Sequence, residues 1–209
     1  MVLNNPFYGG SFMNRDGNWF DKSEENPLDS ETHARVISFQ PPLNEVIAMT
    51  ENGLYLVKLR SVKTIKHFEM GQQVCISIDE NERDEIESVL RIVRYKDLSG
   101  QGKNDLLQII GEIILDKPEA YLSFFNRAQH LSRKMHSFGL LPALGQKLAS
   151  QLAEMRGRGW GSLEEVDVSL KQIRPNFSVE TLLAERFIQE LENPQDVPRL
   201  IDLLLRRDV

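Results

Sequence analysis

The chain has 209 residues, of which 41% are hydrophobic and 27% are charged, and its formal net charge is −6. This composition is typical of a globular protein with a core of its own, and no apolar run approaches the roughly 20 residues that a membrane helix needs. The length suits one large domain or two small ones, and we expect two. The N-terminus lacks a basic region followed by an apolar stretch, so we expect no export and place the protein in the cytoplasm.

Residues 1–31 are rich in Asn, Gly, Asp and Glu, and their aromatic residues follow neither a helical nor a strand period. Such a segment cannot form a core by itself, so we expect an extended N-terminal arm. Its aromatic side chains favour docking, either on the protein's own body or on a partner. These aromatic residues are Phe7, Tyr8, Phe12, Trp19 and Phe20.

The next segment, residues 32–97, consists of short β-type runs separated by turn residues. The runs are HARVISF, NEVIAM, LYLVKL, QQVCISI and SVLRIVRY. The dipeptide Asn52–Gly53 is a strong hairpin signal, because both residues tolerate a positive φ. Five short strands in so few residues predict a small OB-like β-barrel over 32–97.

After Leu98 the apolar residues follow a helical period to the C-terminus, which predicts an all-α domain over 98–209. The fold class is therefore α+β, with an OB-like barrel followed by a helical bundle. The expected helix starts are Ser99 or Asn104, Asp116 before Pro118, Ser162 with Glu165 as a capping box, Ser178, and Asn193–Pro194.

The stretch LLPALGQKLAS, residues 140–150, predicts a helix-hairpin-helix inside this bundle. Such a hairpin turns two helices tightly, so that backbone N–H groups at the start of the second helix point outward and can bind a phosphate. Its three-residue core usually reads Gly, apolar, Gly, whereas here it reads Ala143, Leu144, Gly145. The other interpretation is that Pro142 and Gly145 only separate two helices.

The hairpin lies in the only segment with a positive net charge. Residues 101–161 carry 8 basic and 5 acidic side chains, a net charge of +3. This local excess favours nucleic acid as the ligand. The candidate binding residues are Ala143, Leu144, Gly145, Gln146, Lys147, Arg127, Arg133, Lys134, Arg156 and Arg158.

The run from Ile92 to Leu148 resembles a family of uncharacterised proteins, known mainly from archaea, that are thought to bind nucleic acid. The phrases RYKDL, FFNRAQ, HSFGLLPALGQKL and, further on, SLEEV carry the resemblance. It implies an OB-like barrel joined to a helix-hairpin-helix bundle and a place in nucleic-acid or translation-related biology. The family's hairpin reads PGIGKK where this chain reads PALGQK, so Ala143 and Gln146 weaken phosphate binding at this turn.

Metal and catalytic sites are not expected. The single Cys75 and the four histidines show no ligand spacing, so we predict neither metal nor cofactor. The acidic stretch DENERDE indicates an exposed turn, and neither an activated nucleophile nor a glycine loop for phosphates accompanies it, so we predict no enzyme.

Two functions remain open. The first is a non-catalytic nucleic-acid-binding protein, with RNA slightly favoured over DNA, acting alone or within a larger ribonucleoprotein or protein complex and not at a membrane. The second is a protein-interaction adaptor, in which the aromatic arm and the acidic C-terminal helices dock on a partner and the hairpin is only structural.

Overall fold

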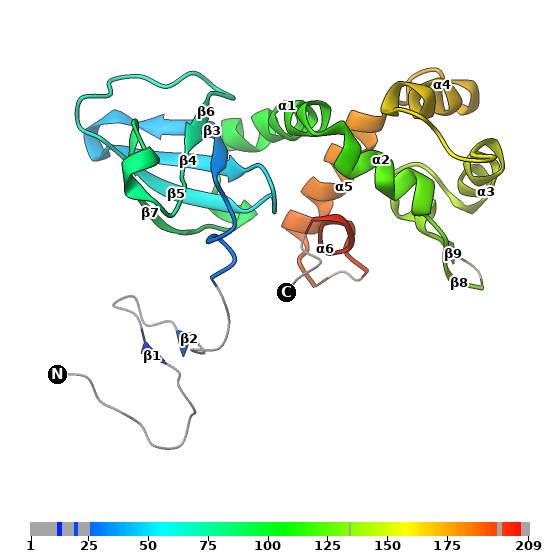
Figure 1. Cartoon of the computed structure of the whole chain (residues 1–209), viewed down its shortest axis with the longest axis horizontal. Helices are drawn as coiled ribbons and strands as arrows, with labels where there is room; N and C mark the ends of the chain where they lie inside the picture. Colours follow the sequence, from blue (N-terminus) through cyan, green and yellow to red (C-terminus); the bar gives the residue numbers. More distant parts are fainter. Residues whose placement is uncertain (1–11, 14–18, 21–25, 134, 196–197, 206–209) are drawn as a thin grey trace.

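A curled antiparallel sheet forms one end of the molecule, and helices extend away from it to the other end (Figure 1). The computed structural model describes residues 12–13, 19–20, 26–133, 135–195 and 198–205. The chain has a mixed α+β fold, as predicted. The last strand of the sheet ends at Ile92 and the first α-helix begins at Gly100, so the switch of period falls near Leu98.

Five strands form the sheet, and each of the five predicted runs overlaps one of them. They are β3 (His33–Gln40), β4 (Glu45–Thr50), β5 (Leu56–Ser61), β6 (Gln73–Cys75) and β7 (Ile86–Ile92). Their order is β6-β3-β4-β5-β7, and every neighbouring pair is antiparallel. The sheet is therefore a half-barrel whose edges are β6 and β7.

The turn between β4 and β5 lies at the predicted Asn52–Gly53 dipeptide, but its backbone differs from the prediction. The positive φ is at Leu54 (51°) and not at the glycine. Gly53 is needed for space, since a Cβ there would lie 2.4 Å from the Tyr55 ring and 2.7 Å from the Glu31 carboxylate. That carboxylate accepts hydrogen bonds from the N–H groups of Asn52 (3.1 Å) and Gly53 (2.6 Å), which ties residue 31 to this turn.

Only parts of the predicted arm lie within the described residues. β1 (Phe12–Met13) and β2 (Trp19–Phe20) pair antiparallel, and residues 26–31 lead into the sheet. The remainder of residues 1–25, and with it the docking of Phe7 and Tyr8, lies outside the described residues.

The two faces of the sheet bury different cores. Val36, Ala48 and Val57 belong to a cluster inside the half-barrel. Ile37 and Met49 face the other way and belong to the large cluster that fills the helical half. Because side chains alternate along a strand, one sheet serves both cores and the helices pack directly on it.

The helical half contains six α-helices in the described residues. They are α1 (Gly100–Asp116), α2 (Pro118–Arg127), α3 (Gln146–Met155), α4 (Leu163–Ile173), α5 (Val179–Glu192) and α6 (Leu200–Leu204). Among the described helices, none combines the length and the apolar character that crossing a membrane requires.

Three predicted helix starts are confirmed by their caps. The hydroxyls of Ser99, Ser162 and Ser178 each accept a hydrogen bond from a backbone N–H of the first turn. The predicted capping box of α4 is only half formed, because the Glu165 carboxylate accepts from the N–H of Gly161, one residue before the N-cap Ser162, at 2.7 Å.

The predicted start at Asn193–Pro194 is wrong, since α6 begins at Leu200. The cap comes from a distant residue. The buried Glu190 carboxylate accepts from the N–H groups of Leu200 (2.6 Å) and Ile201 (2.9 Å). A cap supplied by the preceding helix leaves no local sequence signal.

The prediction that the second half is all helix is also wrong. β8 (His130–Ser132) and β9 (Met135–His136) pair antiparallel between α2 and α3. Ser137 closes this hairpin, since its N–H and its hydroxyl both donate to the Gln129 carbonyl, at 2.9 and 2.7 Å. Only two of the seven residues 130–136 have large apolar side chains, so a helix over this stretch would bury little.

A buried ion-pair network fastens the sheet to the first two helices. Glu51, whose side chain is 6% exposed, lies 2.7 Å from the Arg35 guanidinium and 3.4 Å from the Lys117 ammonium. Arg35 also pairs with Asp116 at the end of α1. Burial acts to raise the pKa of Glu51, but the hydrogen bonds from Gln73 and Arg35 and the charge of Lys117 together lower it below its ordinary value.

We expect Glu51→Gln to lower the free energy of unfolding by roughly 2 kcal/mol, because it removes a buried carboxylate that accepts charge-assisted hydrogen bonds. Since the folded pKa of Glu51 is lowered, its contribution is present above pH 4.5, the ordinary value, and is lost as the pH falls through the folded pKa. Urea denaturation between pH 3 and pH 7 measures both effects. Asp97→Asn, which breaks the exposed pair with Arg94, is the control and should change stability little.

Candidate functional site

The predicted hairpin is a tight turn between a short 3-10 helix and α3. The first arm, η4 (Ser137–Leu140), is a 3-10 helix of four residues, where the sequence predicts a full helix. Leu144 is buried and anchors the turn in the core, whereas Ala143 and Gly145 are exposed. The turn thus presents its backbone to solvent at the start of α3.

Ala143 has a left-handed backbone conformation, with φ at 58°. This conformation suits glycine and costs an L-residue roughly 1–2 kcal/mol. The turn therefore keeps the shape that a glycine would favour, although the sequence has an alanine there.

Gly145 is the N-cap residue of α3, with φ at −56°. A Cβ added there would have no neighbouring atom within 4 Å. Neither the backbone nor the packing therefore demands a glycine. Gly145 also has no side chain that could cap α3. The first N–H groups of a helix have no partner within the helix, so those of α3 are open to a ligand.

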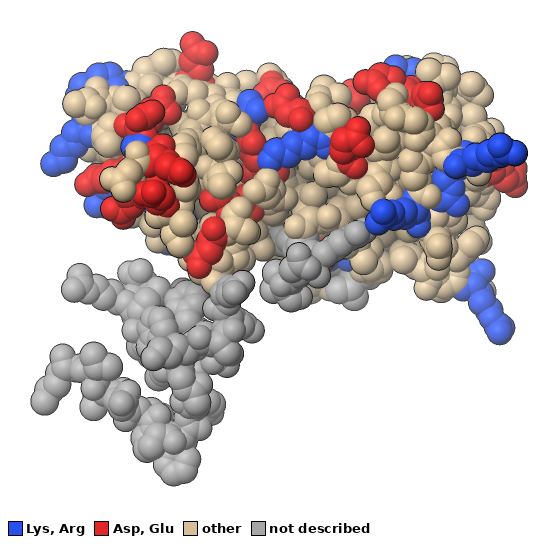
Figure 2. All heavy atoms as spheres, viewed as in Figure 1, with Lys and Arg blue, Asp and Glu red and all other residues tan. Residues whose placement is uncertain are grey.

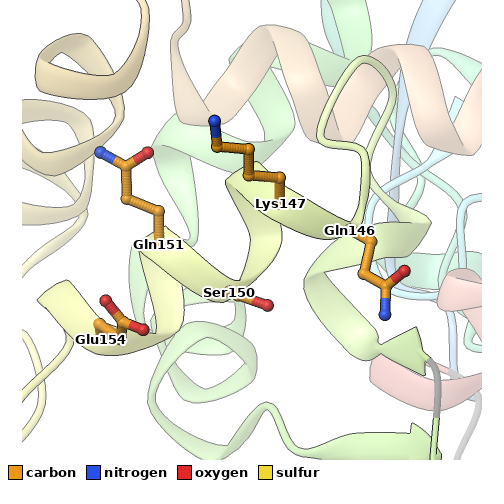
Figure 3. A pocket seen from close by; sticks show the side chains of 5 residues that line it. All are labelled: Gln146, Lys147, Ser150, Gln151 and Glu154. Carbon is orange, nitrogen blue, oxygen red and sulfur yellow. The ribbon is translucent and has the colours of Figure 1, made fainter.

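A surface hollow of about 550 Å³ follows α3 from its first turn. Figure 3 shows its five lining side chains, all from α3, with those of Gln146 and Lys147 diverging at the N-terminal end. Glu154 lies toward the other end of the helix (Figure 3). A phosphate would therefore be attracted to the N-terminal end and repelled from the far one.

The basic candidates fall into two groups. Arg127, Arg133, Lys147 and Arg158 are exposed, and Lys134 lies outside the described residues. Lys147 lies in the first turn of α3, and Arg158 follows its last turn. The axial rise of a helix separates Lys147 from Met155, the last residue of α3, by roughly 12 Å, and Arg158 lies beyond that end.

Arg156 does not face solvent freely, contrary to the expectation. Its Nη1 donates to the carbonyl of Ala128, and more weakly to those of Phe125 and Asn126 at 3.4 Å. Its guanidinium also lies over the Phe138 ring. Arg156 therefore caps the C-terminus of α2 and holds α3 against it. No local sequence pattern distinguishes this role from that of a surface arginine.

The charge on the visible face is uneven. Asp and Glu side chains gather over the sheet, whereas several Lys and Arg side chains protrude at the end that holds α3, β8 and β9 (Figure 2). The basic end agrees with the positive net charge of residues 101–161.

A buried histidine lies directly before the turn. The Nδ1 atom of His136 accepts a hydrogen bond from the N–H of Phe138 at 3.1 Å and so caps η4. Burial, and then the neighbouring His130 and Arg156, lower the pKa of His136 below its ordinary value. His136 is therefore held in its neutral form. Its hydrogen bond to the N–H of Phe138 stabilises the short helix that precedes the turn.

No metal site is present within the described part of the chain, where no three His, Cys, Asp or Glu side chains are grouped to hold an ion.

Comparisons with known proteins place the chain among archaeal relatives. A family model described as a protein of unknown function (DUF655) matches residues 35–199. The uncharacterized protein MJ0038 of Methanocaldococcus jannaschii is 24% identical over 139 residues, which are 64% of this chain and 63%, less than two thirds, of that protein. The crystal structure of Af1531 from Archaeoglobus fulgidus is similar with a TM-score of 0.70 at 27% identity, covering 82% of this chain and 99% of that one.

Ala143→Gly should raise the free energy of unfolding by about 1 kcal/mol, because relief of the left-handed alanine outweighs the greater freedom of glycine in the unfolded chain. Chemical denaturation measures the change. Ala153→Gly, in the last turn of α3, is the control and should lower stability by up to about 1 kcal/mol. A loss of stability in Ala143→Gly would contradict the left-handed conformation.

The lowered pKa of His136 predicts stability that is complete above pH 6.5, its ordinary value, and falls as the pH decreases through the folded pKa. His136→Asn keeps an acceptor for the Phe138 N–H but does not titrate in this range. We expect the wild type to lose stability between pH 7.5 and pH 5 and the variant to lose less. If the wild type and the variant have equal pH profiles in denaturation experiments, ionisation of His136 does not affect the stability of the protein.

Proposed function

The chain belongs to the DUF655 family, and from its site we propose that it is a non-catalytic protein that binds nucleic acid by the phosphate backbone. The ligand approaches the N-terminus of α3, and exposed Arg and Lys side chains around it add charge. RNA ranks slightly ahead of DNA, on the translation-related biology that the sequence resemblance implies.

The open backbone at Gly145 is the observation that carries this proposal. A glycine that neither its φ nor its neighbours require leaves the backbone at the start of α3 uncovered, which allows the close approach of a ligand. The free N–H groups and the positive end of the α3 dipole favour an anion at this place. Phosphate binding of this kind reads no base.

Lys147 supplies the nearest positive charge, and Arg158 adds charge at the far end of the same helix. Their separation exceeds that of neighbouring phosphates, so the two side chains contact phosphates several nucleotides apart. Gln146 adds an amide instead of a second charge. Affinity therefore depends strongly on salt but is lower than in a hairpin with two glycines and two lysines.

The fold supports two more detailed proposals about the architecture of the chain. The five-stranded, partly open antiparallel half-barrel supports an OB-like barrel over 32–97. The turn after η4 supports a helix-hairpin-helix within a helical domain over 98–209, with an unusually short first arm. The aromatic and aliphatic cluster shared by the sheet and the helices makes these domains one packed body.

A protein-interaction adaptor is the second candidate. Leu90 and Ile92 are 37% and 43% exposed on β7, which forms an open edge of the sheet. An edge strand with exposed apolar side chains is suited to pairing with a strand of another protein. On this interpretation the α3 turn is only a fold element.

Lys147→Glu separates the two candidates. We expect weaker binding to single-stranded RNA and DNA of any sequence, and a slope of log K against log salt that is smaller by about one unit, because one phosphate contact is lost. Fluorescence anisotropy at several KCl concentrations measures both quantities.

Lys63→Glu is the matched control, since it makes the same charge change on an exposed loop of the sheet half. It should leave the salt slope unchanged. If both variants weaken binding equally, or if the wild type binds no nucleic acid at low salt, the phosphate-binding role of α3 is excluded and the adaptor takes its place.

A further inference from the structure

A second cavity, of about 200 Å³, lies where the sheet meets the start of α1. It is separate from α3, which lies at the other end of the molecule (Figure 1). Gly102 closes one side of it, since a Cβ there would come within 3.1 Å of the Ile37 side chain. The glycine thus lets the first turn of α1 approach β3 closely.

One row of cross-strand neighbours forms the floor of this cavity. Ser38 of β3 pairs with Ile47 of β4, Ile47 with Lys58 of β5, and Lys58 with Arg91 of β7. All four residues line the cavity. Directly paired residues point to the same face, so four strands present one hydroxyl, one aliphatic side chain and two cations side by side.

The cavity is balanced in charge. Its two cations, Lys58 and Arg91, are matched by two carboxylates, Glu45 and Asp97. Lys58 donates to Glu45 Oε2 at 2.7 Å, and Asp97 is bonded to Arg94 at the rim. A phosphate would meet nearly as much repulsion as attraction here, so this cavity differs from the α3 site in the chemistry it accepts.

Its walls suit a flat, uncharged ring with polar edges. Val93 and Leu98 are buried and give it apolar walls. Gln40 at the rim offers both an amide donor and an acceptor. Within the described residues no partner occupies Glu45 Oε1, which leaves a carboxylate oxygen free to accept from an amino group.

Arg91 is the one cation of the cavity without a described partner. It is exposed, and no described residue forms a hydrogen bond or ion pair with its guanidinium. A planar guanidinium stacks on the face of a base, as in recognition of unpaired RNA. The volume is below the roughly 300 Å³ of a site for a drug-sized ligand, which fits one ring system and not a whole nucleotide.

We propose that this cavity binds a single unstacked nucleobase that carries an exocyclic amino group. Arg91 stacks on the base, and the free oxygen of Glu45 accepts from its amino group. The inference builds on the proposed nucleic-acid binding and specifies the ligand as single-stranded, because a base paired in a duplex cannot enter a cavity.

Nucleosides test the cavity without involving the α3 site, since they have no phosphate. Amide chemical shifts of the full chain are followed while cytidine, uridine or ribose 5-phosphate is added. We expect cytidine to shift the amides of Ile47, Lys58 and Arg91, uridine to shift them less, and ribose 5-phosphate to leave them unchanged.

Arg91→Ala should weaken cytidine binding by about fivefold, the loss of one stacking contact at a solvent-accessible position. Lys63→Ala removes the same charge from an exposed loop of the sheet half, outside the cavity, and should have no effect. Both substitutions are at exposed residues, so the fold is retained.

Two groups of results would overturn the inference. Equal shifts with uridine, shifts away from the cavity, or binding of ribose 5-phosphate would exclude an amino-bearing base as its ligand. Equal weakening of cytidine binding by Lys63→Ala would show that only the overall charge of the protein matters. Neither result affects the α3 site, whose own failure appears separately as an unchanged salt slope in Lys147→Glu.

Discussion

The buried carboxylate of Glu51 is the contact on which the arrangement of the molecule depends. It follows the last residue of β4, and it receives Arg35 from β3 and Lys117 from the junction of α1 and α2. A charge this deeply buried is tolerated only where its partners are fixed. The network therefore fixes the C-terminal end of α1 against β3 and the end of β4, and the common core of sheet and helices supports this arrangement.

A second internal contact, made by Arg156, holds α3 in place at the other end of the molecule. Arg156 binds the last carbonyls of α2 and lies over Phe138, whose ring packs against Phe124 and Phe125 of α2. α3 is thus held by α2, through the Arg156 hydrogen bonds, and by η4, through the Phe138 ring. A backbone site needs such support, because free N–H groups bind a phosphate only if they are held in one geometry.

Local patterns in the sequence predict much of this fold, and contacts between distant residues account for what they miss. The apolar runs locate every strand of the sheet, and Ser162 with Glu165 marks the start of α4. The start of α6 was not predictable, since its cap, Glu190, belongs to another helix.

The same limit applies to the candidate sites. The turn before α3 is visible in the sequence as PALG, although the structural role of Arg156 is not. The base-sized cavity could not be predicted at all, because Ser38, Ile47, Lys58 and Arg91 become neighbours only through the register of four strands.

The proposed function requires that a phosphate backbone contacts the open N-terminus of α3. An amide chemical-shift titration with a short abasic oligonucleotide isolates this contact, since that ligand offers phosphates and no bases. We expect the largest shifts at Gly145, Gln146 and Lys147, and their loss at high salt. Shifts confined to β7 and the sheet edge, with none at α3, would contradict it.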